Sequence, residues 1–147
     1  MAYALFAHRK IELTGEINIV SLQQTQRSNE QYMLATKTLS LQQKMSSLQS
    51  GQAAELAQCY KALSEEEDSD KRTSINTVIS EKQKEFDVEL DKINQEIYTV
   101  SVRENAIEME VKRLDTKLTA LQKQLEAVEQ AESNAIDRAT PKFKGVG

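Results

Sequence analysis

The fold of this chain is decided by residues 86–128, which read FDVELDKINQEIYTVSVRENAIEMEVKRLDTKLTALQKQLEAV. Residues taken at alternating steps of four and three along this stretch are apolar at every position except Glu104. The series is Phe86, Leu90, Ile93, Ile97, Val100, Glu104, Ile107, Val111, Leu114, Leu118, Leu121, Leu125 and Val128. Because a mean step of 3.5 residues keeps one stripe of a helix against a partner helix, the pattern predicts the seam of a left-handed coiled coil.

The composition of the whole chain agrees with long helices. Its 147 residues include four glycines, one proline and no tryptophan. So few turn formers and aromatic residues argue against a globule with many loops. Two long helices would bury a narrow stripe rather than a broad core. We therefore expect the protein to bind itself, as a homo-oligomer, or another helical protein.

The first arm of the chain carries a weaker stripe than residues 86–128. Polar residues occupy the stripe over residues 24–31, and Gln52 interrupts it again. Leu56, Tyr60 and Leu63 then restart it one position out of phase. Polar residues in a seam weaken helix pairing but can fix its register.

A polar stretch, residues 64–74, predicts where the chain reverses. It reads SEEEDSDKRTS and has no apolar periodicity. Ser64 and Glu67 fit a capping box, and Ser69, Thr73 or Ser74 could cap a following helix.

The resulting fold prediction is all-α, a long antiparallel helical hairpin of coiled-coil type that is expected to self-associate. The expected boundaries are helix 1 over residues 16–67, a turn over 68–73 and helix 2 over 74–137. The alternative is one uninterrupted helix, because helices tolerate all the charged residues of the polar stretch.

The two ends of the chain are the candidate assembly contacts. Residues 1–15 are either an apolar arm that docks into a neighbouring subunit or the first turns of helix 1, continued through Gly15 at about 1 kcal/mol. Residues 138–147 form a basic tail in which Pro141 ends the helix. The contact residues that we expect are Leu5, Phe6, Phe143 and Val146.

Charge is distributed unevenly along the chain, whose formal net charge is −4. Residues 1–63 carry six basic and four acidic side chains, a balance of +2, whereas residues 75–137 carry eight and fourteen, a balance of −6. This difference favours antiparallel pairing of the two arms. The acidic main body argues against a nucleic-acid partner, which requires a basic face.

No catalytic, cofactor-binding or metal-binding motif is present in the sequence, and we expect neither an enzyme nor a small-molecule substrate. His8 is the only histidine, and no cysteine or carboxylate lies around it at metal-ligand spacing. Cys59 is the only cysteine, which excludes an intramolecular disulfide framework and favours a small packing residue.

The apolar run at the amino terminus is too short for a secretory signal, and no stretch reaches the ~20 apolar residues that span a bilayer. We therefore expect a cytoplasmic protein unless a signal-independent system exports it. Membrane attachment through Leu5 and Phe6, with Arg9 and Lys10 at the headgroups, is the weakest hypothesis, since one apolar turn is a poor anchor.

Acidic helical hairpins of about this size are similar in architecture to the export-stalk proteins of flagellar and type III secretion machines and to some phage scaffolding proteins. The resemblance is carried by architecture and not by a motif. The first hypothesis for the function is a non-enzymatic coiled-coil structural protein that self-assembles into an oligomer or filament. The alternative is an adaptor, chaperone or scaffold of a secretion or phage-morphogenesis machine.

Overall fold

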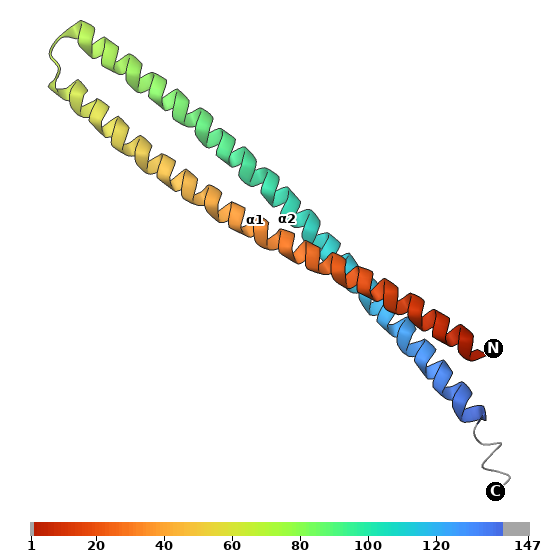
Figure 1. The fold of residues 1–147 in the computed structure, drawn as a ribbon. Helices are drawn as coiled ribbons and strands as arrows, with labels where there is room; N and C mark the ends of the chain where they lie inside the picture. Colours follow the sequence, from red (N-terminus) through yellow and green to blue (C-terminus); the bar gives the residue numbers. More distant parts are fainter. Residues whose placement is uncertain (1, 140–147) are drawn as a thin grey trace. The chain divides into compact units, whose positions relative to one another are not determined.

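The computed structural model describes residues 2–139 and contains two α-helices in that range (Figure 1). Helix α1 spans Ala2–Glu65 and helix α2 spans Ser69–Ala139, and residues 66–68 connect them. The prediction of an all-α fold, built from two long helices that pack together, is confirmed. The alternative of one uninterrupted helix is wrong, because the chain leaves the helical conformation at residues 66–68.

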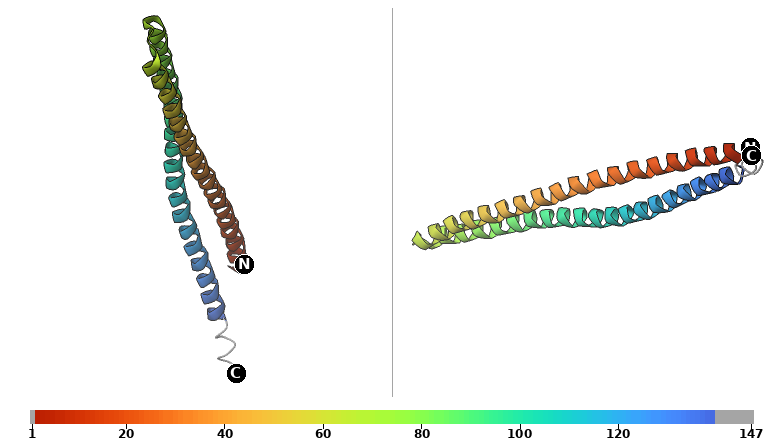
Figure 2. Two further views of the ribbon diagram at one scale, coloured as in Figure 1. Left: turned by 90° about the vertical axis from the view of Figure 1, so that its left-hand side faces the viewer. Right: turned by 90° about the horizontal axis from the view of Figure 1, so that it is seen from below.

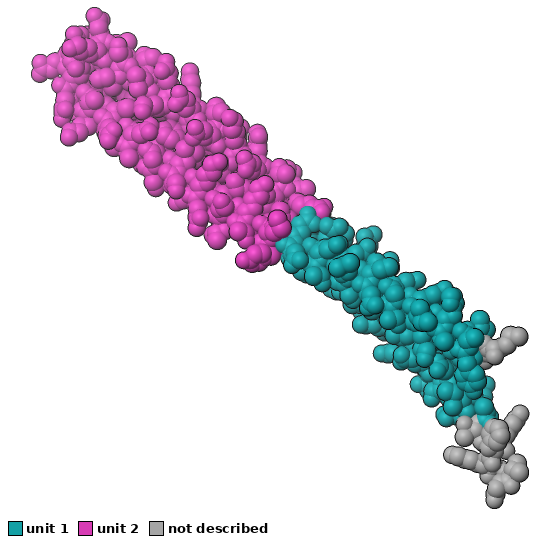
Figure 3. Space-filling view, viewed as in Figure 1, with its two compact units in different colours: residues 1–31, 106–147 teal, residues 32–105 magenta. Residues whose placement is uncertain are grey.

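The helices pair in two compact units (Figure 3). Unit 1 combines residues 1–31 with residues 106–147, and unit 2 contains residues 32–105. In each unit a segment of α1 runs antiparallel to a segment of α2 (Figure 2). Each unit has its own apolar cluster and its own polar contacts between the helices.

The core of unit 1 is formed by one stripe from each helix. Its buried residues are Leu13, Val20, Leu114 and Leu121, and the half-buried residues packed against them are Ile17, Leu118, Leu125 and Val128. Lys10 Nζ and Glu132 Oε2 form an ion pair 2.7 Å long across the two helices. The apolar stripe of α2 therefore meets the short apolar run at the start of the α1 stripe.

The core of unit 2 has the same construction. Its buried residues are Leu41, Ile93 and Val100, and the half-buried residues packed against them are Leu34, Met45, Leu48 and Ile97. Toward the connection between the helices, Lys82 Nζ lies 3.1 Å from Glu55 Oε2. These contacts place the second half of α1 against the first half of α2.

The interruption of the α1 stripe near Gln52 is matched in α2. The covered residues of α1 take two successive steps of four, from Leu48 through Gln52 to Leu56, and those of α2 do the same around Phe86. The two stretches lie opposite each other, because Leu48 and Phe86 line the same hollow. Since both helices shift by the same amount, their stripes remain face to face on either side of the interruption.

The next covered residue after Leu56 differs from the one that the sequence suggests. Cys59 is half-buried, whereas Tyr60 is half exposed and points out of the stripe. The reason is the return to a step of three after Leu56, which brings Cys59 rather than Tyr60 toward α2. Cys59 is thus a small side chain at the helix pairing, as its size suggests.

The reversal of the chain lies slightly earlier than the expected turn over 68–73. The Asp68 carboxylate accepts a hydrogen bond of 2.9 Å from the backbone N–H of Asp70, so that Asp68 caps α2. Arg72 Nη1 donates to the carbonyl oxygens of Leu63 and Glu66 at 3.1 and 3.0 Å, which satisfies acceptors at the end of α1.

The hydroxyl groups that were candidate caps have other partners in the structure. Thr73 and Ser74 donate to the backbone oxygens of Ser69 and Asp70, within α2. Ser64 donates to the Lys61 oxygen, in the last turn of α1, instead of completing a capping box. Because Asp68 provides a cap earlier in the chain, α2 begins at Ser69 and not at residue 74.

At the start of the chain, α1 runs from Ala2 through Gly15 without a break, so residues 2–15 are the first turns of this helix and no separate arm. Gly15 has an ordinary negative φ and is exposed. Helix α2 ends at Ala139, and the predicted contacts Phe143 and Val146 lie outside the described residues.

Candidate functional site

The predicted seam residues of α2 all lie on its covered side. Ile93, Val100, Ile107, Leu114 and Leu121 are buried, and the other eight members of the series are half-buried. Glu104, the polar member, accepts a hydrogen bond of 3.2 Å from the hydroxyl of Thr38 on α1. The series therefore lies on the side of α2 that pairs with α1.

Polar side chains face each other where the α1 stripe of unit 1 is polar. Arg27 donates to Glu110 across the helices at 2.9 Å and to Glu30 on its own helix at 2.7 Å. The hydrogen bonds to Glu30 and Glu110 raise the pKa of Arg27 above its ordinary value. Gln24 donates to the carboxylate of Asp115 in the same layer. These contacts align α1 with α2.

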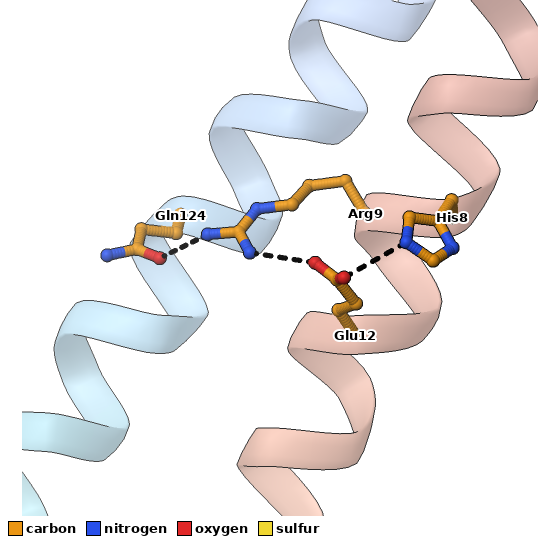
Figure 4. Close-up of polar contacts among 4 residues, drawn as sticks. All are labelled: His8, Arg9, Glu12 and Gln124. Atoms are coloured by element: carbon orange, nitrogen blue, oxygen red, sulfur yellow. Dashed lines mark hydrogen bonds and ion pairs between the residues drawn. The ribbon is translucent and has the colours of Figure 1, made fainter.

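A second polar group joins the helices near the start of α1 (Figure 4). Arg9 donates to Glu12 at 3.1 Å and to the side-chain oxygen of Gln124 on α2 at 3.3 Å. His8 lies on the other side of Glu12, with 3.0 Å between its Nε2 and the carboxylate. The hydrogen bond from Arg9, followed by the charge of His8, lowers the pKa of Glu12.

This arrangement explains His8 as a surface residue paired with Glu12. Within the described range, no three residues among the histidines, cysteines, aspartates and glutamates are grouped so that they could hold a metal ion.

Unit 2 has a shallow hollow of about 310 Å³ beside Gly51 and Phe86. Glu55, Glu85 and Glu89 line it as well, and it is open to solvent. A Cβ atom at Gly51 would meet nothing within 4 Å, so the absent side chain is one cause of the hollow. Carboxylates on solvated helix faces do not by themselves define a ligand site, and we assign none to it.

The side of α1 that faces away from α2 carries few charged residues over most of its length. Between residues 14 and 54 only five side chains are charged. Arg27 points to α2, and the other four are Glu16, Glu30, Lys37 and Lys44. These four are spaced by multiples of seven residues, so they form a single row along one edge of the helix. The rest of the exposed surface of this stretch carries no charge.

Large apolar side chains stand on this surface in both units. We define the outward face of α1 by six such residues, all more than half exposed: Ile11, Ile19, Leu22, Tyr32, Met33 and Leu39. The first three belong to unit 1 and the last three to unit 2. Apart from Glu12 and the charged row, the exposed residues between them are small or uncharged polar residues, mainly serine, threonine, asparagine and glutamine. An apolar surface without charge is typical of the centre of a protein–protein interface.

Helix α2 presents a different surface. Residues 81–92 and 103–117 are dense in acidic and basic side chains that point to solvent. Exposed apolar residues also occur on α2, including Tyr98 and Met109. The charges of α2, however, are not confined to one row along the helix. These two stretches of α2 are therefore more highly charged than residues 14–54 of α1.

The two contact residues predicted near the amino terminus differ in their exposure to solvent. Leu5 is exposed, and Phe6 is half-buried on the side that faces α2. The outward face of α1 itself was missed by sequence reasoning, which considered only the stripe of this helix and its two ends. The usable signal was the seven-residue spacing of the few charges between residues 14 and 54.

Neither described helix contains a segment long and apolar enough to cross a membrane. No protein-family model, no curated protein and no solved structure matches this chain.

Proposed function

We propose that this protein is a non-enzymatic structural protein that assembles with copies of itself through the outward face of α1. The observation that carries the proposal is the scarcity of charge on that face beside six exposed apolar side chains. Lysine and glutamate usually dominate a helix surface that remains in water, and their depletion is typical of an interface core.

The apolar residues involved are large enough to stabilise a complex. Covering a side chain such as leucine or isoleucine contributes on the order of 1.5–3 kcal/mol relative to leaving it in water. Tyr32 and Met33 are 76% and 69% exposed, and the aromatic ring and thioether are side chains enriched in interfaces. A second copy has the same surface, so few charges would be desolvated when the two faces meet.

We also infer that α1 and α2 of one chain pair as a coiled coil. The support is the alternation of three- and four-residue steps among the covered residues of both helices, with the matched interruption near Gln52 and Phe86. In this reading the internal seam holds the hairpin together and leaves the opposite side of α1 for assembly.

The experiment compares two double variants by light scattering on a sizing column over a range of concentrations. Tyr32→Lys with Met33→Lys places two charges on the outward face of α1. Tyr98→Lys with Met109→Lys is the matched control on α2, since these residues are 71% and 73% exposed. We expect wild type and the control to exceed the 16.6 kDa of one chain and the α1 variant to remain at that mass.

Circular dichroism should show equal helicity for all three proteins, because the substituted side chains are exposed. If wild type stays at the mass of one chain at every concentration, self-assembly is excluded. The outward face of α1 would then be a docking surface for a helix of a different protein, as an adaptor requires. Equal loss of assembly in both variants would mean that another surface makes the contact.

A further inference from the structure

We infer that the charges along one side of α2 hold the two helices of the hairpin in a single register. Arg27 of α1 pairs with Glu110 in the observed register. It would meet a basic side chain instead if the helices slid past each other by one heptad in either direction. The contact lies within unit 1, and the inference does not depend on the proposed self-assembly.

The apolar stripes do not by themselves select this register. In unit 1 the stripe of α2 is apolar at every position from Ile107 to Val128, and it repeats every seven residues. A slide of seven residues therefore brings apolar positions of α2 back against Ile17 and Val20 of α1. The shifted stripes would differ only in which isoleucine, leucine or valine lies at each level.

The connection between the helices also permits a slide. Because α1 and α2 run antiparallel, a change of seven residues in their pairing moves the reversal of the chain by only half as many residues. In one direction the reversal stays inside the polar stretch, residues 64–74, where Ser69, Thr73 and Ser74 can cap a helix. The loss of the Asp68 cap is then offset by another residue of the same stretch.

The charges on the side of α2 that contacts Arg27 do distinguish the registers. Residues seven apart lie on the same side of a helix in such a pair, and this row of α2 contains Arg103, Glu110 and Lys117. In the observed register Arg27 Nε donates to Glu110 Oε1 at 2.9 Å. A slide of one heptad would put Lys117 or Arg103 in the place of Glu110. Either slide replaces an attraction by a repulsion.

The pair of Arg27 and Glu110 is partly shielded from water. Their side chains are 30% and 28% exposed. Charges in such positions are screened less than charges at the open surface, so a reversal of sign has a larger effect there. Glu30 also pairs with Arg27, at 2.7 Å, but it lies on α1 and moves with Arg27 in every register. The choice of register therefore depends on the charge that α2 presents.

The neighbouring contacts of unit 1 agree with this assignment or are neutral to it. Arg9 donates to Gln124, which follows Lys117 by seven residues. A slide in one direction would set Arg9 beside Lys117, which adds a second repulsion. Gln24, which donates to Asp115, carries no charge and would find another polar side chain after either slide. Gln24 therefore distinguishes the registers less than Arg27 does.

Distances between two spin labels test the inference in the full chain, with Cys59→Ala to remove the native cysteine. Gln23→Cys on α1 and Ser133→Cys on α2 place the labels at exposed positions of unit 1. In the observed register the labels are separated along the helix axis by about 28 Å, at 1.5 Å per residue. A slide that brings Arg27 to residue 117 shortens this separation to about 18 Å. Dilution with unlabelled protein removes distances between copies.

The decisive variant exchanges two charges of the row. Glu110→Lys with Lys117→Glu keeps the composition but moves the carboxylate one heptad along α2. We expect the shorter distance to become the main one, because Arg27 then meets a carboxylate only after the slide. Glu108→Lys with Lys112→Glu is the matched control, since it exchanges an exposed ion pair of the same helix. The control should keep the wild-type distance.

Addition of Arg27→Glu to the exchanged pair should restore the wild-type distance, because opposite charges again meet at position 110. An unchanged distance in the exchanged variant would overturn the inference. The register would then be set by the matched interruption of the stripes near Gln52 and Phe86. Loss of helicity in the exchanged variant, without recovery on addition of Arg27→Glu, would also overturn it, because the restored attraction should recover the fold.

Discussion

Single residues determine where α1 ends and α2 begins. Asp68 caps α2 through the N–H of Asp70, and Arg72 reaches back to two carbonyl oxygens at the end of α1. Both contacts are local, so a connection of three residues needs neither glycine nor proline. The acidic residues of this segment are therefore part of the reversal and not only a solvated charge cluster.

Replacement of Asp68 by alanine should lower the free energy of unfolding by about 1 kcal/mol, because the N–H of Asp70 loses its acceptor. Urea unfolding followed by circular dichroism measures the change. Glu67→Ala, one residue earlier, is the control and should change the free energy much less. Equal effects of the two substitutions would show that charge and not capping matters at this position.

Gly15 and Gly51 lower the stability of α1, and no steric constraint requires glycine at either position. Both lie inside the helix with ordinary φ, and a Cβ at either position meets nothing within 4 Å. Alanine at either site should raise the free energy of unfolding by roughly 0.5–1 kcal/mol, by restricting the unfolded chain. Thermal unfolding of the single and double variants measures the gain. Destabilisation by Gly51→Ala would mean that the hollow beside Phe86 must stay open.

The pairing of Arg9 with Glu12 should be visible in the titration of the carboxylate. The pKa of Glu12 is lowered, so this pair stabilises the fold above the ordinary pKa of 4.5 and loses its effect as the pH falls through the lowered value. In Arg9→Gln the pKa of Glu12 should rise toward its ordinary value. NMR titration of the side-chain carboxyl resonance gives both pKa values, and an unchanged pKa would contradict the contact.

At the scale of the elements, each helix has one stripe that holds the hairpin, and α1 has a second surface opposite to it. Leu13 and Leu22 lie on the same helix and in the same unit, yet Leu13 is fully buried and Leu22 is 59% exposed. The same substitution at the two positions therefore separates the two surfaces of α1.

In dilute solution, Leu13→Ala should lower the free energy of unfolding by about 2–4 kcal/mol, because it leaves a cavity in the core of unit 1. Leu22→Ala should change it by less than about 0.5 kcal/mol and should weaken assembly instead. Denaturant unfolding at low concentration and light scattering at high concentration measure the two effects. Similar destabilisation by both substitutions would contradict the division of α1 into two surfaces.

The elements also show how far sequence reasoning reaches. The 3.5-residue period of α2 is dense and apolar, and it identifies the covered side of that helix from Phe86 to Val128. In α1 the covered side contains Gln24 and Arg27, whose partners lie on α2 and are distant in sequence. Such positions become recognisable only when Asp115 and Glu110 are known to face them.

The ends of the helices were harder to predict from the sequence than their covered sides, because several neighbouring residues can cap a helix. Several residues between Ser64 and Ser74 can cap a helix, and their sequence does not rank Asp68 above Ser69 or Thr73. The outward face of α1 was overlooked because serine, threonine and glutamine are ordinary surface residues when taken singly. Their meaning comes from the absence of charge among them, which is a property of the whole face.

At the scale of the whole molecule, the exposed side of α1 is nearly uncharged between residues 14 and 54, whereas residues 81–92 and 103–117 of α2 are densely charged. Charge on α2 keeps that surface hydrated, whereas α1 exposes apolar side chains in both units. A closed contact between two copies would cover the α1 surface and leave α2 outside. The structural role that we propose depends on this contact.

The most direct test of this account is sedimentation equilibrium of the wild-type protein from low micromolar to near-millimolar concentration. We expect the mass to rise from 16.6 kDa toward a multiple of that value as the concentration increases, because the outward face of α1 binds a second copy. A mass that stays at 16.6 kDa at every concentration would contradict the central claim that the outward face of α1 binds a second copy.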